Sequence, residues 1–184
     1  MILSDTKILE EIKRGNIVIT PFDKSCLGSN SYDLHLGNLL GKYKDRTIDA
    51  KKDNELEYME ISRKGFEITP NDFYLASTFE YTETHGFVPF LDGKSSTGRL
   101  GLSIHETAGK GDAGFKGYWT LEMRAGHPVR IYPGMPIAQI FYHTLEGGVE
   151  IPYNEKVGAK YSGQENRPVG SRMYKNFGKD PFWK

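Results

Sequence analysis

The sequence predicts a mainly β fold, in the form of a sandwich, a barrel or a jelly roll. The chain has 184 residues, including 21 glycines and 11 tyrosines. Its apolar runs are short and are separated by turns that contain glycine or proline, as is typical of β proteins. We find neither an internal repeat nor a change in composition that would mark a second domain, so residues 1–184 are expected to form one domain with its own core.

One helix is expected near the N-terminus, over residues 4–15. Ser4 can cap its N-terminal end, and Ile8 and Ile12 fall on one apolar stripe. Gly15 can end the helix in a left-handed conformation.

The rest of the chain reads as strands and turns. Turns are expected at Gly37-Asn38 and Pro133-Gly134. Residues 44–56 are polar and are expected to form a solvated loop or a hairpin tip. The expected strands cover residues 17–19, 34–36, 73–81, 100–104, 118–123, 129–132 and 137–142.

Composition excludes several classes of protein. With 24 acidic and 24 basic side chains the net charge is zero, which argues against nucleic-acid binding but allows a local basic pocket for an anion. The single cysteine, Cys26, forms neither an intramolecular disulfide nor a thiolate metal cluster. No run approaches the roughly 20 apolar residues of a membrane helix, and the N-terminus does not resemble a signal peptide. We therefore expect a cytoplasmic protein without a membrane partner.

Glu122 is a candidate catalytic carboxylate. A period of two places Trp119, Leu121 and Met123 on one face of a strand and Glu122 on the other. Spacing alone favours a solvent-exposed position for Glu122. If that face lines a pocket instead, desolvation would raise the carboxyl pKa and make Glu122 a plausible general base.

A cationic, hydroxyl-rich turn precedes that strand. It contains Lys94, Ser95, Ser96 and Arg99, whose hydroxyl and guanidinium groups are typical phosphate ligands. The Walker sequence is absent, and a plain polar hairpin turn would show the same residues. The pattern therefore indicates a phosphate site only in combination with other features.

Two familiar catalytic centres do not fit the sequence. The zinc deaminase signature requires a Pro-Cys-x-x-Cys motif that a chain with one cysteine cannot supply. A Ser-His-Asp triad would lack its Gly-x-Ser-x-Gly turn. Any deamination is therefore expected to be independent of zinc.

The C-terminal tail, about residues 153–184, differs from the rest of the chain. Residues 158–170 are glycine-rich and polar, so they form either a frayed end or a lid that orders over a ligand. The apolar residues that follow are expected to dock on the same or a neighbouring subunit; they are Met173, Tyr174, Phe177, Phe182 and Trp183.

Taken together, the motifs resemble the dCTP deaminase family, a branch of the trimeric dUTPase superfamily. The resemblance covers nearly the whole chain, and the order and spacing of its motifs are more specific than any one of them. The matching segments are residues 1–5, 31–37, 94–101, 105–109, 112–117, 120–122, 133–139, 152–153, 160–164 and Ser171.

The resemblance implies a role for each matched residue. Glu122 would activate the water that attacks C4 of cytosine, and Ser95 and Arg99 would position that water and bind phosphate. The remaining implied ligands of the nucleotide are Lys94, Ser96, Ala108, Asp112, Gln139, Tyr153, Lys160 and Gln164.

The resemblance also implies a fold, a cofactor and an assembly. The fold would be a distorted β-barrel or jelly roll of the dUTPase type, assembled as a homotrimer with active sites between subunits. Magnesium would arrive with the triphosphate, and no protein metal site is expected. Deamination of dCTP to dUTP and ammonia is the first expectation for the activity.

Three alternatives remain open. A bifunctional enzyme would carry dCTP on to dUMP and pyrophosphate, and Gly109 could leave room for the second water that this needs. A plain dUTPase or a non-catalytic nucleotide-binding protein could share the scaffold. Glu122, the helical N-terminus and the lack of a C-terminal Gly-Gly-Phe-Gly-Ser type motif argue against a plain dUTPase. The presence of Glu122 together with Ser95 and Arg99 argues against a non-catalytic binder, which would not need that carboxylate.

Overall fold

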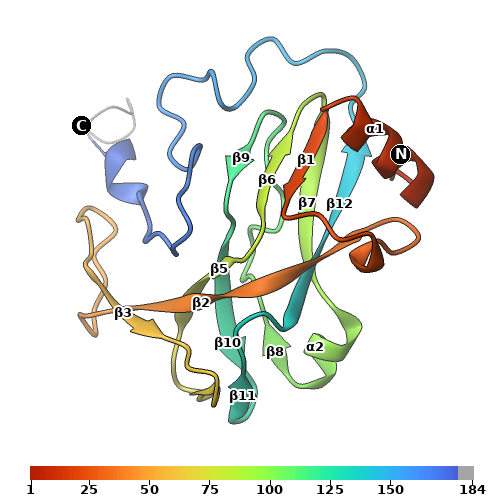
Figure 1. The fold of residues 1–184 in the computed structure, drawn as a ribbon. Helices are drawn as coiled ribbons and strands as arrows, with labels where there is room; N and C mark the ends of the chain where they lie inside the picture. Colours follow the sequence, from red (N-terminus) through yellow and green to blue (C-terminus); the bar gives the residue numbers. More distant parts are fainter. Residues whose placement is uncertain (178–184) are drawn as a thin grey trace.

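The N-terminal helix forms as the sequence predicts. A computed structural model describes residues 1–177, and in it α1 (Asp5–Lys13) precedes a mainly β body (Figure 1). The Ser4 side chain caps the helix by accepting the Lys7 N–H at 3.4 Å. Gly15 has φ 77°, the left-handed conformation that ends a helix without strain. Among the described residues, no helix has the length and hydropathy that crossing a membrane would require.

Within residues 1–177 the body is built from three antiparallel sheets, and this bears out the predicted mainly β class. The largest has the order β7 (Phe87–Gly93), β12 (Pro136–Thr144), β2 (Tyr32–Tyr43), β5 (Tyr74–Thr78), β10 (Thr120–Ala125) and β8 (Leu102–Ser103), with β3 (Leu56–Glu60) also paired to β2. The second has the order β1 (Ile17–Thr20), β6 (Tyr81–Thr84) and β9 (Lys116–Gly117). The third pairs β11 (Val129–Ile131) with β4 (Phe66–Ile68). The short helices are η1 (Lys24–Cys26), α2 (Ser95–Arg99) and η2 (Met173–Asn176).

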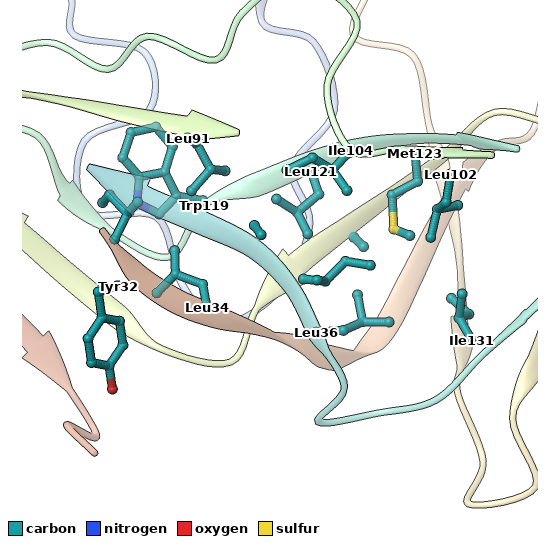
Figure 2. Packing of buried hydrophobic residues seen from close by; sticks show 14 of the residues in the cluster. Tyr32, Leu34, Leu36, Leu91, Leu102, Ile104, Trp119, Leu121, Met123 and Ile131 are labelled. Atoms are coloured by element: carbon teal, nitrogen blue, oxygen red, sulfur yellow. The ribbon is translucent and has the colours of Figure 1, made fainter. Parts of the chain in front are cut away.

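The core lies where the inward faces of these strands meet. Leu34 and Leu36 of β2 are fully buried, as are Leu121 and Met123 of β10, and their side chains point into one apolar cluster (Figure 2). Alternation along each strand explains this, because every second side chain faces the same side of a sheet. Burying a side chain of this size contributes roughly 1.5–3 kcal/mol.

The turn predicted at Gly37-Asn38 is wrong. Both residues lie inside the continuous strand β2. Glycine is needed there for close packing, because a Cβ on Gly37 would lie 2.8 Å from Ser77 Oγ and 2.9 Å from Ser77 O of the neighbouring strand. The pairing of β2 with β5 shifts its register in this region, between Leu36 and Leu40.

Two other predictions change in detail. The segment predicted as a cationic turn forms α2, and the strand that follows it is reduced to two residues of β8.

The polar segment 44–56 connects β2 to its antiparallel partner β3, as a hairpin would. The turn predicted at Pro133-Gly134 lies between β11 and β12, where Gly134 has φ 76°.

The C-terminal segment docks on its own chain. It leaves β12, crosses the molecule and packs beside the β3 side, at the left of Figure 1. Tyr58 donates to Pro168 O at 3.1 Å, and Tyr174 donates to Asp53 at 3.0 Å. Phe182 and Trp183, also expected to dock, lie outside the described residues.

Candidate active site

A cavity of about 700 Å³ opens between the β5–β10 part of the large sheet and the C-terminal segment. Much of its wall is aromatic, with Phe73, Trp119 and Tyr161 among the lining residues. Aromatic and apolar walls with a few polar groups are typical of small-molecule sites. The cavity is large enough to accept a nucleotide base and sugar.

Glu122 stands on the wall of this cavity. The burial pattern of β10 alternates as predicted, with Leu121 and Met123 buried and Glu122 half-buried on the opposite face. That face lines the cavity rather than open solvent, so the solvent-exposed position favoured by spacing is wrong. The Glu106 N–H donates to Glu122 Oε2 at 2.9 Å, and the Glu122 N–H donates to Ile104 O at 2.8 Å. Residues 104–106 thus hold the carboxylate in place.

Four other predicted ligands line the same cavity: Ala108, Asp112, Tyr153 and Gln164. Asp112 is exposed and pairs with Lys110 at 3.0 Å. The Tyr153 hydroxyl accepts the Tyr161 N–H at 3.0 Å. Together with Glu122, these four residues are called the cavity group below.

The remaining predicted residues lie elsewhere on the chain. Lys94, Ser95, Ser96 and Arg99 are on or next to α2, at the lower right of Figure 1, and none of them lines the cavity. Gln139 joins them, because its side chain donates to Gly93 O at 3.2 Å. These five residues are called the α2 group.

The α2 group is partly free to receive a ligand. Ser95, Ser96 and Arg99 are exposed, and within residues 1–177 the Arg99 side chain makes no ion pair or hydrogen bond. Lys94 forms an ion pair with Asp33 of β2, a residue of the matched segment 31–37 that was not singled out as a ligand. A cationic group without an internal partner is suited to bind an external anion.

Lys160, predicted as a triphosphate ligand, belongs to neither group. It does not line the cavity, and its ammonium donates to Asn176 Oδ1 at 3.1 Å. One chain therefore does not bring all the predicted site residues together.

The room expected beside Gly109 is not present. A Cβ on this residue would lie 2.5 Å from Leu91 O, and the Leu91 N–H donates to Gly109 O at 2.6 Å. The glycine therefore allows this loop to pack against β7, and it creates no pocket for a water.

Sequence reasoning missed Thr120 and Tyr43. Thr120 lines the cavity on the same face of β10 as Glu122, and that shared face was the available signal. Tyr43 lies at the far end of β2, and its hydroxyl accepts the Ser171 N–H at 2.8 Å. Burial raises the pKa of Tyr43 above its ordinary value, so the hydroxyl ionises even less readily than that of an exposed tyrosine. No local pattern links Tyr43 to the site.

The donor set for metals is sparse. In the described part of the chain, no three His, Cys, Asp or Glu side chains gather closely enough to hold a metal ion. A Mg²⁺ ion carried by a triphosphate fits these surroundings, since such ions are held mainly by phosphate oxygens and water.

The arrangement of strands is that of a known enzyme fold. A solved dCTP deaminase from Agrobacterium tumefaciens superposes with a TM-score of 0.64 at 20% sequence identity, over 80% of this chain and 49% of the other. The chain thus spans about half the length of that protein, and the likeness shows that the two proteins share a fold class.

The family follows from the sequence comparisons. The family model described as dCTP deaminase-like matches residues 2–145, and the chain belongs to this family. A protein of Cytophaga hutchinsonii named "dCTP deaminase, dUMP-forming" is 48% identical over 97% of this chain and 100% of its own length. Proteins of the same name from Clostridium botulinum and Leptospira biflexa are 47% and 44% identical, each over 97% of this chain and 100% and 99% of their own lengths.

Proposed function

We propose that this protein is a dCTP deaminase that carries its substrate to dUMP and pyrophosphate, with Glu122 as the proton-transfer group. The observation that carries the proposal is the position of Glu122, a carboxylate on the wall of a nucleotide-sized cavity. Relatives that are 44–48% identical over 97% of the chain bear the name of this activity.

In the first step, the Glu122 carboxylate takes a proton from a water whose oxygen attacks C4 of the cytosine ring. The bond from C4 to the exocyclic amino nitrogen then breaks, and the carboxyl returns the proton to that nitrogen, which leaves as ammonia. The hydroxyl left on C4 becomes the uracil carbonyl as its proton moves to ring nitrogen N3. One water and dCTP give dUTP and ammonia. The α2 group, through Ser95 and Arg99, would orient this water and bind phosphate.

In the second step, a further water attacks the α-phosphorus of dUTP, and the bond to the β-phosphate oxygen breaks to leave dUMP and pyrophosphate. The sequence alone placed release of dUTP first. The names of the full-length relatives favour the dUMP-forming alternative instead.

A second subunit would complete the site. In one chain the exposed Ser95 and Arg99 lie away from the cavity that Glu122 lines, so a homotrimer would bring the α2 group of one subunit to the cavity group of the next. Mixing inactive Glu122→Gln and Arg99→Ala proteins under conditions of subunit exchange should then restore activity, because some sites combine two intact groups. Absence of any recovery in verified mixed oligomers would contradict a shared site.

Magnesium would enter with the triphosphate and neutralise its charge, and the protein would use no zinc. Turnover of dCTP should fall on removal of Mg²⁺ by EDTA and return on its addition. It should be insensitive to a chelator selective for zinc.

The cytoplasmic location expected from the sequence stays a prediction.

Product analysis tests the proposal directly. The protein is incubated with dCTP and Mg²⁺, and nucleotides are separated by ion exchange while ammonia is measured. We expect dUMP, pyrophosphate and ammonia in equal amounts. Accumulation of dUTP with ammonia would support the dUTP-forming alternative, and hydrolysis of added dUTP without action on dCTP would indicate a plain dUTPase. Binding without turnover would indicate a non-catalytic protein.

A further inference from the structure

Two donors of the C-terminal segment converge on one hydroxyl of β10. The Gln164 side-chain amide donates to Thr120 Oγ1 at 2.5 Å, and the Val169 N–H donates to the same oxygen at 3.1 Å. Gln164 is only 9% exposed, so its amide cannot rely on bulk water as an alternative partner. A single side chain therefore receives bonds from both ends of the stretch 164–169.

The adjoining backbone is shaped to receive the same stretch. Gly117 pairs with Gln164 in a parallel bridge, and a Cβ on Gly117 would lie 2.7 Å from Gln164 N. Its φ of 137° is in a region that other residues rarely adopt. The Tyr118 N–H donates to Gln164 O at 3.1 Å, and the Gly163 N–H donates to Lys116 O at 2.8 Å. Residues 116–120 thus form the edge on which the C-terminal segment docks, called the docking edge below.

This docking edge ends beside the candidate catalytic carboxylate. Thr120 and Glu122 are two residues apart on the same face of β10, and both line the cavity. Gln164, Val169 and Gly170 of the C-terminal segment line the same cavity. The position of the C-terminal segment therefore determines how the cavity is closed next to Glu122.

We propose that Thr120 is a positioning residue that fastens residues 163–169 over the cavity and so sets the enclosure in which Glu122 acts. Its hydroxyl acts through the docked segment and is not itself part of the chemistry. The docking role of Thr120 follows from the contacts above, and only the expected change in KM and kcat rests on the proposed function.

Replacing Thr120 with valine keeps shape and strand preference but removes the acceptor. Two donors then lose their partner, one of them on a buried side chain, and each lost bond weakens the docked state by severalfold. We expect the population of the undocked segment to rise by about tenfold or more. Thr120→Ser retains the hydroxyl and is the matched control.

Hydrogen exchange on the nucleotide-free protein tests the docking claim. The amides of Tyr118 and Gly163 report on the docking edge, and in Thr120→Val both should exchange about tenfold faster or more, while Thr120→Ser stays close to the wild type. Val169→Pro removes one of the two bonds from the tail side without altering β10, and it should accelerate the same amides. Unchanged exchange in both Thr120→Val and Val169→Pro would overturn the proposal.

Kinetics separate positioning from a general loss of stability. We expect Thr120→Val to raise the KM for dCTP several-fold more than it lowers kcat, with recovery in Thr120→Ser. Equal KM and kcat values in Thr120→Val and Thr120→Ser would contradict the positioning role. If exchange responds as expected but the wild-type protein does not turn over dCTP, the proposed function fails and the docking role of Thr120 stands.

Discussion

The substitution Glu122→Gln tests the central residue with little structural change. The Glu106 N–H reaches Glu122 Oε2 at 2.9 Å, and the side-chain oxygen of a glutamine can accept the same bond. Because Glu122 lines the cavity and is not fully buried, we expect the free energy of unfolding to change by less than about 0.5 kcal/mol. For a chain of this size, that corresponds to a shift of about 2 °C or less in Tm.

The chemical effect should be much larger. An amide cannot accept a proton at neutral pH, so the general-base contribution of about 10²–10⁴-fold is lost. This corresponds to about 2.7–5.4 kcal/mol in the activation free energy. Release of ammonia from dCTP, followed in a coupled assay, should fall by that factor, while the affinity for dCTP stays within severalfold.

A matched control is available on the adjacent loop. Glu106 is exposed and pairs with Arg124 at 2.8 Å, so Glu106→Gln removes a nearby negative charge without altering Glu122. We expect less than a threefold effect from it, since exposed ion pairs contribute little. Near-normal ammonia release by Glu122→Gln would remove this residue from the mechanism, as would an equal loss in the control.

Three further predictions concern stability. The Tyr142 hydroxyl is fully buried and has no hydrogen-bond partner among residues 1–177, so Tyr142→Phe should raise the free energy of unfolding by about 1 kcal/mol in urea denaturation. A Cβ on Gly111 would lie 2.5 Å from an indole carbon, so Gly111→Ile should lower that free energy by about 1–3 kcal/mol. Hydrogen bonds from Asn16 and Lys7 hold the pKa of Glu11 below its ordinary value of 4.5. The ionised Glu11 carboxylate therefore stabilises the folded protein fully above pH 4.5, and this contribution is lost as the pH falls through the folded-state pKa, which lies below 4.5. The destabilisation caused by Glu11→Gln should become smaller over the same range.

Local sequence patterns correctly predicted those helices and strands that depend on neighbouring residues in the chain. The helix from Asp5 to Lys13 follows from its cap and apolar stripe, and the buried face of β10 follows from alternation around Leu121. The family also followed from the sequence, because the order of many short motifs is specific where each one is weak. The same patterns failed at Gly37, where a contact with Ser77 on another strand, and no turn, requires glycine.

The same distinction between local patterns and tertiary contacts applies to the candidate active site. The sequence by itself determined which residues are suited to chemistry, and it placed Glu122, Ser95 and Arg99 in one 28-residue stretch, 95–122. Only the tertiary structure decided that Glu122 faces a cavity, that α2 lies away from it, and that Thr120 holds the C-terminal segment beside it. The physical reason is that exposure and proximity depend on what packs against a strand, and those partners come from parts of the chain more than 40 residues away, such as Gln164 against Thr120.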